Sequence, residues 1–572
     1  MIHTRRGLDG LVTAPHHMAA EAGADILRQG GNAVEAMVAA AAAIAVVYPH
    51  MNSIGGDGFW IVAEPGKDPV GIDASGPAAR AATPDFYAEA GHPDAIPARG
   101  PLAALTVPGT VSGWAKALDL AAGWGKGLPP ARLLEAAIDH AERGVPVTAG
   151  QEALMHDKLK ELKDAPGFAE TYLSAGGAIP TEASLLRQPD LADTLRRLAE
   201  AGLDDFYRGD MARTLAKGLE AAGSPLTLAD LEGFEAFRTD PLSVDLRVGR
   251  AFNMPPPTQG VSALMILALF ERLGVAEAEG FDHIHGLVEA TKQAFLLRNA
   301  HVTDPAYMDR DAADWLAPAF LDERAGRIEA KRALPWPAPA KPGDTIWMGA
   351  ADKDGRVVSF IQSTFWEFGS GTVPADTGVV LQNRGASFTL DPAHANCLKP
   401  GKRPFHTLIP ALARLKDGRT LAYGNMGGEG QPQSQAAIFT RHVMFGRPLQ
   451  EAITAPRWLL GKTWGAETTT LKLENRFDPG LVDALKAAGH DVELLAPFTS
   501  TMGHAGAVAT RPDGIIEGAN DPRSDGAGVA HGAGERGQQT VQQGSSSGRN
   551  IETGSLSLMR GTAPVARGGR AC

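Results

Sequence analysis

The stretch PGDTIWMGAADKDGRVVSFIQSTFWEFGSG, residues 342–371, decides the fold. An Asp-Gly pair at 354–355 stands at its centre. Alternating apolar residues flank this pair on both sides, a pattern typical of a β-hairpin closed by a two-residue type I′ turn. Such a turn places residue 345 opposite residue 364, with residue 363 next to it. Thr345 then lies beside Ser363 and Thr364, and three hydroxyl groups gather at one end of the hairpin.

The chain changes character immediately before this hairpin. Residues 333–343 read ALPWPAPAKPG, which cannot form the interior of a helix and predicts an exposed loop. The peptide bond between Asp344 and Thr345 therefore joins a loop to a buried strand. A chain that cuts itself there exposes an α-amine with an ordinary pKa of about 7.7–8, which can serve as the base for the Thr345 hydroxyl. The simple alternative is an ordinary strand threonine, because Thr is a good strand former.

Several blocks in chain order carry a resemblance to a known family. They are GNAVEAMVAA (31–40), IGGDGFW (54–60), VPGTVSGW (107–114), MPPPTQG (254–260), KRPFHTLIP (402–410), MGGEGQP (426–432) and NDPRS (520–524). Together with Thr345 and the FGSG at 368–371, they resemble the γ-glutamyltranspeptidase family of self-cleaving N-terminal-nucleophile hydrolases. The resemblance implies an α+β protein with four αββα layers. It also implies Thr345 as nucleophile, Ser363 as supporting hydroxyl, and Gly427 and Gly428 as the oxyanion hole.

Cleavage between Asp344 and Thr345 would divide the chain into two subunits that stay together as a heterodimer. Residues 1–344 would form a helix-rich large subunit, and residues 345–525 a small subunit. Residues 526–572 are rich in Gly, Ser, Gln and Arg without an apolar period, and we expect this tail to be disordered.

The substrate pocket departs from the transpeptidase pattern. Ser75 stands where the family has the Arg that binds a glutamyl α-carboxylate. Arg384 and Ser387 replace the Gln and Asp that bind the α-amine, Phe365 replaces an Asn, and the pair at 406–407 replaces two serines. The pocket has lost an anionic group and gained a cation. The resemblance therefore implies a substrate that has a carboxylate but no α-ammonium group, held by Arg384 with His406 and Thr407 as further donors. A surface or structurally paired role for Arg384 is the alternative.

These changes most resemble the oxamate amidohydrolase branch of the family. The expected activity is hydrolysis of a small carboxylate-bearing amide, such as oxamate, to oxalate and ammonia through an acyl-enzyme, as a step of purine catabolism. The alternatives are γ-glutamyl transfer or glutathione hydrolysis, a glutaryl-type (cephalosporin) acylase, and an uncleaved, non-catalytic binding relative. No cofactor is expected. His285 and Glu289 have a metal-like i, i+4 spacing, but without a third ligand at usable spacing we expect them to be structural, with no metal.

Composition narrows the class of protein. The 572 residues carry a formal net charge of −12, which argues against nucleic acid or an anionic membrane as a partner. The N-terminal residues lack a continuous apolar segment of the kind found in secretory signals, and the apolar run 36–48 is too short to span a bilayer. Two cysteines cannot form a disulfide framework. The sequence thus predicts a cytoplasmic enzyme acting on a small amide.

Overall fold

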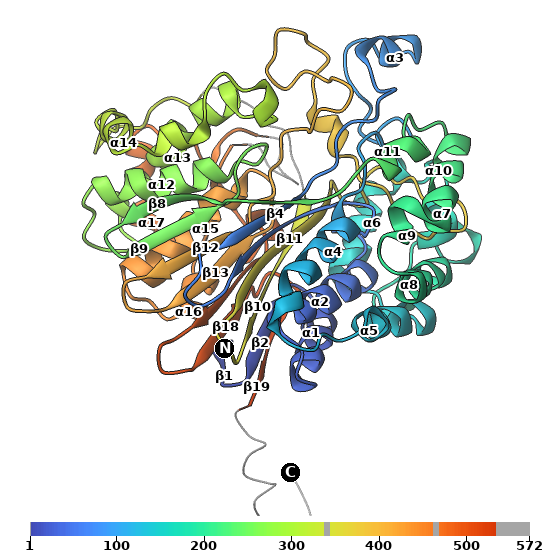
Figure 1. Cartoon of the computed structure of the whole chain (residues 1–572). Coiled ribbons are helices and arrows are strands. Elements are labelled where there is room, and N and C mark those ends of the chain that lie inside the picture. Colours follow the sequence, from blue (N-terminus) through green and yellow to red (C-terminus); the bar gives the residue numbers. More distant parts are fainter. Residues whose placement is uncertain (1, 337–343, 462–467, 533–572) are drawn as a thin grey trace, which may run out of the picture. The chain divides into compact units, whose positions relative to one another are not determined.

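The computed structural model describes residues 2–336, 344–461 and 468–532. Two seven-stranded antiparallel sheets form its centre (Figure 1). The first, the β10 sheet, contains in spatial order β19 (Ala527–His531), β2 (Gly10–Ala14), β10 (Asp344–Asp352), β11 (Val357–Phe365), β3 (Asp57–Ala63), β4 (Val70–Ala74) and β7 (Phe237–Thr239). The second, the β12 sheet, contains β1 (Arg5–Gly7), β18 (Ile516–Asn520), β17 (Ala505–Thr510), β13 (Thr420–Asn425), β12 (Ala411–Leu415), β9 (Gly249–Asn253) and β8 (Leu242–Leu246).

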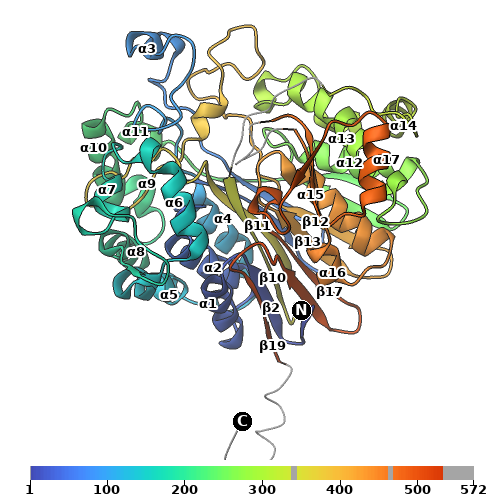
Figure 2. The ribbon, with the colours of Figure 1, turned by 180° about the vertical axis from the view of Figure 1, so that it is seen from behind.

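Helices cover the outer face of each sheet, and the views from front and back agree on the two sides (Figures 1 and 2). On the β10 sheet side lie α1 (His17–Arg28), α2 (Ala33–Val47), α4 (Thr110–Ala121), α5 (Pro130–Arg143), α6 (Ala149–Leu162), α8 (Pro189–Ala201) and α10 (Asp210–Ala222), with the shorter α7 (Phe168–Tyr172), α9 (Asp205–Arg208) and α11 (Leu228–Glu232). On the β12 sheet side lie α12 (Gly260–Arg272), α13 (Phe281–His301), α14 (Pro318–Ala325), α15 (Gly430–Phe439), α16 (Leu449–Thr454) and α17 (Pro479–Ala487). The expected four-layer αββα architecture is confirmed.

Smaller elements complete the described chain. They are the helix α3 (Pro84–Glu89), the sheet of β14 (Trp458–Leu460), β15 (Leu471–Glu474) and β16 (Val492–Leu495), and the strand pair β5 (Val145–Pro146) and β6 (Leu185–Leu186). None of the helices in the described ranges is both long and apolar enough to cross a membrane.

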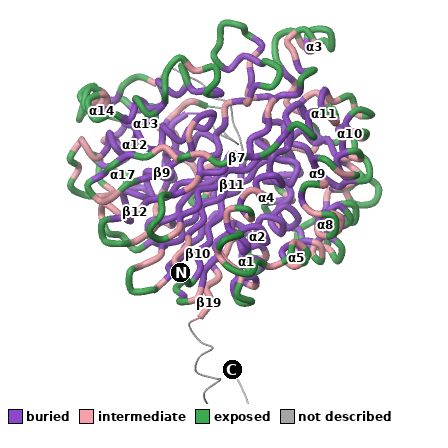
Figure 3. Tube along the Cα trace, in the orientation of Figure 1, coloured by how far each residue is buried: buried purple, intermediate pink, exposed green. Residues whose placement is uncertain are grey.

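Side-chain alternation assigns the two faces of the β10 sheet. Met348 and Phe360 belong to the apolar core shared with the helices, whereas Trp347 and Ile361 belong to the core between the two sheets. Ser363 lies two residues after Ile361 on β11 and so shares its inter-sheet face, and Thr345 lies on the same face because its Oγ1 is 3.2 Å from Oγ of Ser363. The central strands are buried throughout (Figure 3). The N-terminal end of β10, which carries Thr345, therefore faces the space between the two sheets. The β12 sheet can contribute side chains there.

The β10–β11 hairpin forms, but the predicted register is wrong by one residue. Ile346 pairs with Gln362, and residues 353–355 form the connection in place of a two-residue turn. The cause is Asp352, whose carboxylate accepts the backbone N–H of Asp354 (3.0 Å) and of Arg356 (3.1 Å) and so stabilises the wider loop. The register shifts across Thr345, which stands opposite the two residues 363 and 364, so that Asp344 pairs with Phe365 as in the predicted register.

The expected boundary of the C-terminal tail also changes. Residues 527–531 form β19, which pairs with β2 at the edge of the β10 sheet, so this part of the tail is a strand. Its Gly-Val-Ala sequence is small and apolar enough to add to an existing edge, although it lacks the length of a strand predictable alone. Residues 533–572, and the 337–343 part of the loop before the hairpin, lie outside the described residues.

One glycine shows how tightly the sheet end is built. A Cβ atom at Gly56 would overlap the carbonyl oxygen of Ser363, a backbone atom that cannot move without shifting β11. Gly56→Ala should lower the free energy of unfolding by about 1–3 kcal/mol. Urea denaturation measures this. Gly58→Ala is the matched control, because its Cβ would meet the ring edge of Phe360 at 3.2 Å and the carbonyl oxygen of Ile361 no closer than 3.4 Å. Equal urea midpoints for Gly56→Ala and the parent would contradict the packing described.

Candidate active site

The threonine at the start of β10 contacts the expected serine. Thr345 is fully buried, and its Oγ1 donates to Oγ of Ser363 over 3.2 Å. Ser363 Oγ also accepts the backbone N–H of Phe365 at 2.8 Å. The third expected hydroxyl does not join them, because Thr364 Oγ1 donates to the carbonyl of Trp366. The structure thus brings together the predicted nucleophile and its supporting hydroxyl despite the changed register.

Asp57 lies beside Ser363 on the neighbouring strand β3. It is the β3 residue paired with Ser363. Its Oδ1 accepts three hydrogen bonds, from the backbone N–H of Gly76 (3.1 Å) and Gly109 (3.2 Å) and from Nε2 of Gln382 (2.9 Å). Burial raises the pKa of Asp57 to about 7, although these donors oppose the shift. A carboxyl group that titrates near neutral pH therefore lies one strand away from Ser363.

His406 lies against the other oxygen of this carboxyl group. Nε2 of His406 is 3.1 Å from Oδ2 of Asp57, and this oxygen accepts no hydrogen bond from the described residues. Burial, and secondarily the charge of Arg384, keep the pKa of His406 well below its usual value, so its ring is neutral. With three donors on Oδ1, the proton of neutral Asp57 belongs on Oδ2, from which it can bond to Nε2 of His406.

Arg384 is a buried cation of the site. Its side chain is 1% exposed, and Nη1 donates to Oγ1 of Thr407 at 3.2 Å. Nε and Nη2 have no hydrogen-bond partner among the described residues, and none of the described carboxylates forms an ion pair with it. Its guanidinium lies 4.1 Å from the ring centre of Phe365, and burial lowers the pKa of Arg384 to about 9. A buried guanidinium with unused N–H groups is suited to bind a carboxylate.

The two remaining predicted pocket residues are hydrogen-bonded to protein groups. Ser75 Oγ donates to Oδ1 of Asp73 at 2.5 Å, and Asp73 in turn is paired with Arg403 at 2.6 Å. Ser387 Oγ donates to the carbonyl of Phe405 at 3.2 Å. The hydroxyl protons of both serines are therefore committed within the protein, and their substrate contacts stay predictions.

Gly427 and Gly428 lie between β13 and α15 with φ angles of +116° and +52°, which favour glycine. The carbonyl of Gly427 accepts the N–H of Gly430 at 2.8 Å. In a trans peptide the N–H points opposite to the carbonyl, so the N–H of Gly428 is turned away from α15. The N–H of Gly428 is therefore not used in the first turn of α15, and its role as an oxyanion donor stays a prediction.

Asp57 and Gln382 are the residues that sequence reasoning missed. Asp57 stands in the block at 54–60, one glycine before the apolar residues FWIVA. A carboxylate at the head of a fully buried strand is costly unless it is hydrogen-bonded, and that is the signal that could have identified it. Gln382 gives no comparable signal, because only the folded chain brings it to Asp57.

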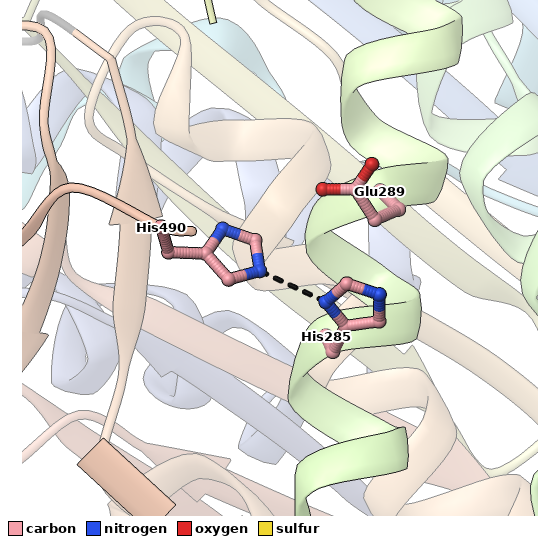
Figure 4. A group of neighbouring side chains, drawn as sticks. All are labelled: His285, Glu289 and His490. Carbon is pink, nitrogen blue, oxygen red and sulfur yellow. Dashed lines mark hydrogen bonds between the residues drawn. The ribbon is translucent and has the colours of Figure 1, made fainter. Parts of the chain in front are cut away.

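A second buried cluster resembles a metal centre (Figure 4). His490 supplies the third group beside His285 and Glu289, and their ligand atoms lie within 4.8 Å of one another. Each group is already bonded. His285 Nε2 must donate to the carbonyl of Glu329 (2.8 Å), so its Nδ1 accepts from Nε2 of His490 (2.9 Å). Glu289 accepts from Nζ of Lys292 at 2.6 Å. The adjacent ammonium disfavours a metal ion, and the arrangement favours the structural role expected from the sequence.

A four-layer fold in which a central strand begins at a buried threonine defines the class of N-terminal-nucleophile hydrolases. The sequence profile of the γ-glutamyltranspeptidases matches residues 19–531. The chain is 55% identical over 523 residues to the oxamate amidohydrolase proenzyme of Klebsiella pneumoniae, covering 91% of this chain and 98% of the relative. It is 39% identical to a glutathione hydrolase-like proenzyme of Bacillus subtilis, covering 91% and 98%. Cephalosporin acylase from Bacillus halodurans superposes with a TM-score of 0.85 at 33% identity, covering 93% and 97%.

This chain belongs to the γ-glutamyltranspeptidase family. It is a self-processing N-terminal-nucleophile amidohydrolase that acts on amides.

Self-cleavage should separate Asp344 from Thr345, and Thr345→Ala should leave one uncut, inactive chain. Gel electrophoresis and N-terminal sequencing of the small fragment measure this. Ser363→Ala should slow cleavage while lowering stability by about 1–3 kcal/mol, because it leaves the buried N–H of Phe365 without its acceptor. A small fragment that begins at any residue other than Thr345 would overturn the assignment.

Proposed function

We propose that the cleaved protein hydrolyses the monoamide of a small dicarboxylic acid, with oxamate as the preferred substrate. The observation that carries this proposal is the buried guanidinium of Arg384, whose Nε and Nη2 have no hydrogen-bond partner among the described residues. In oxamate the carboxylate is bonded directly to the amide carbonyl carbon, so the substrate has one anionic group and no ammonium group. The likeness to the Klebsiella proenzyme supports the same substrate.

The reaction proceeds through an acyl-enzyme. Oγ1 of Thr345 attacks the amide carbon while its proton passes to the free α-amine of the same residue. Backbone N–H groups of Gly427 and Gly428 stabilise the tetrahedral oxyanion. The C–N bond then breaks, the α-amine returns the proton to the leaving nitrogen, and ammonia departs. Water attacks the remaining ester, which releases oxalate and restores the Thr345 hydroxyl.

Charge in the pocket disfavours a γ-glutamyl donor. Its α-ammonium group would need a carboxylate, but Asp73 is paired with Arg403, and Asp57 is neutral below its pKa of about 7. The same ammonium would lie near the Arg384 cation. Leaving such groups unsatisfied costs about 1–3 kcal/mol each, and more for charges. The γ-glutamyltransferase and glutathione hydrolase alternatives are therefore weaker than oxamate hydrolysis.

The acylase alternative rests on the likeness to the cephalosporin acylase. A glutaryl-type substrate also ends in a carboxylate and would use the same cation, but at a greater distance from the amide. A set of monoamides of increasing chain length separates the two functions. Gel electrophoresis tests the remaining alternative, a binding relative that never cleaves itself, because such a protein would run as one band.

We place the enzyme in the cytoplasm, in purine catabolism, as a heterodimer of its own two fragments. The charge of −12 and the cysteine content support a cytoplasmic site. Strand β10 of the small fragment pairs with β2 of the large one, and β11 pairs with β3, so sheet hydrogen bonds would hold the cut chain together.

Arg384→Met should lower kcat/KM for oxamate roughly 100-fold, because charge-assisted hydrogen bonds contribute about 1.5–3 kcal/mol each. Cleavage should be unaffected, since no substrate is bound during maturation. Arg441→Met is the matched control, because Arg441 is equally buried and pairs with Glu279. It should cost stability and leave KM unchanged. Parent-like hydrolysis by cleaved Arg384→Met would show that Arg384 is structural.

The KM for oxamate should rise as the pH increases from 6 to 8.5. Asp57 has a raised pKa of about 7, so it is neutral below that pH and becomes anionic above it. The new charge attracts Arg384 and competes with the substrate carboxylate, on the order of tenfold in KM. Steady-state kinetics of the parent and of Asp57→Asn test this, and the variant should show a flat KM. An equal pH dependence in Asp57→Asn would exclude Asp57 as its origin.

A further inference from the structure

One glutamine side chain connects the two halves of the site. Gln259, which directly precedes α12, is fully buried. Its Nε2 donates to the carbonyl of Gly428 (2.9 Å) and to the carbonyl of Thr407 (2.9 Å). Its backbone N–H donates to the carbonyl of His406 at 2.9 Å. The same residue thus binds the glycine loop at 427–428 and the segment that contacts Arg384.

Arg298 on α13 fixes the orientation of this amide. Nη1 of Arg298 donates to Oε1 of Gln259 at 2.7 Å, and Nη2 donates to Oε2 of Glu429 at 2.6 Å. A guanidinium can only donate, so Oε1 must face Arg298 and Nε2 must face the two carbonyls. The amide cannot flip without losing these bonds. Arg298 is 2% exposed and its guanidinium lies 3.6 Å from the ring centre of Phe295, which holds it in place.

We propose that Gln259 is a positioning residue that sets the length of acyl chain the enzyme accepts, and that Arg298 locks it. The proposal rests on the proposed function, in which the 427–428 glycines hold the oxyanion and Arg384 holds the carboxylate. Because Gln259 is bonded to both segments, it fixes the distance between the oxyanion donors and the carboxylate-binding cation.

This distance matters because the substrate is short and rigid. In oxamate no methylene separates the carboxylate from the reacting carbon. The oxyanion donors and the Arg384 guanidinium must therefore lie at one fixed distance from each other. A longer monoamide places its carboxylate farther away, and a rigid pocket then loses either the carboxylate contact or the attack geometry. A single misplaced methylene is typically worth about 10–200-fold in kcat/KM. Removing the hydrogen bond from Gln259 to the Gly428 carbonyl should reduce this discrimination between chain lengths. It should also lower kcat, because the oxyanion donor is no longer fixed in position.

The test compares hydrolysis of the monoamides of oxalic, malonic and succinic acids by the cleaved protein. Gln259→Met keeps the side-chain length but removes its hydrogen bonds. It should lower kcat for oxamate at least tenfold, and should lower the ratio of kcat/KM for oxamate over succinamate at least tenfold. Arg298→Met should act in the same direction, and Arg298→Lys should recover part of the loss because it can still donate to Oε1.

Gln435→Met is the matched control. Gln435 is equally buried, donates to the carbonyl of Ile409 and accepts from Asn253, but does not contact the glycines. It should lower stability without changing the chain-length ratio. Gln259→Asn, which keeps an amide, provides a second variant if Gln259→Met does not fold and cleave.

The outcomes separate the two proposals. The positioning role is overturned if the parent hydrolyses oxamate and cleaved Gln259→Met keeps the parental ratio of kcat/KM for oxamate over succinamate. This holds whether or not kcat of the variant is reduced. If the parent hydrolyses none of the three monoamides, the proposed function itself fails, and the positioning role falls with it. If Gln435→Met lowers the chain-length ratio of kcat/KM values as much as Gln259→Met does, the change comes from packing in general rather than from the Gln259 contacts.

Discussion

The rest of the site depends on the positive charge of Arg384, with which none of the described carboxylates forms an ion pair. An arginine buried without a carboxylate costs several kcal/mol, which stable packing elsewhere has to offset. The surroundings reduce that cost only in part, through the ring of Phe365, the hydroxyl of Thr407 and the nearby carboxyl group of Asp57. A substrate carboxylate would satisfy the guanidinium, so its binding can be strong although the substrate is very small.

The position of the site follows from the two sheets. Strand alternation directs Thr345, Ser363 and Asp57 to the inter-sheet face at one end of the β10 sheet. The β12 sheet and the segments around it then contribute Gly428 and His406 from the opposite side. A cut before Thr345 leaves both fragments inside both sheets, because each sheet contains strands from both sides of the cut. Cleavage can therefore expose a catalytic amine without separating the fragments.

Much of this arrangement could be predicted from local sequence and family resemblance. The apolar alternation around 342–371 predicts the hairpin, and the resemblance implies the αββα fold and the contact of Thr345 with Ser363, which the structure confirms. The register could not be predicted, because it depends on the two backbone bonds made by the Asp352 carboxylate. Gln382, Gln259 and His490 were also out of reach, since their partners lie far away in sequence and only the packed sheets and helices bring them together.

The most direct measurement is a competition between oxamate and a γ-glutamyl anilide on the same cleaved sample, with ammonia and aniline release followed together. The ratio of the two kcat/KM values reports which charge pattern the pocket accepts, independently of how much enzyme is active. We expect a ratio of at least about 100-fold in favour of oxamate, because oxamate gains the carboxylate contact and leaves no ammonium group unpaired. Faster release of the aniline would contradict it.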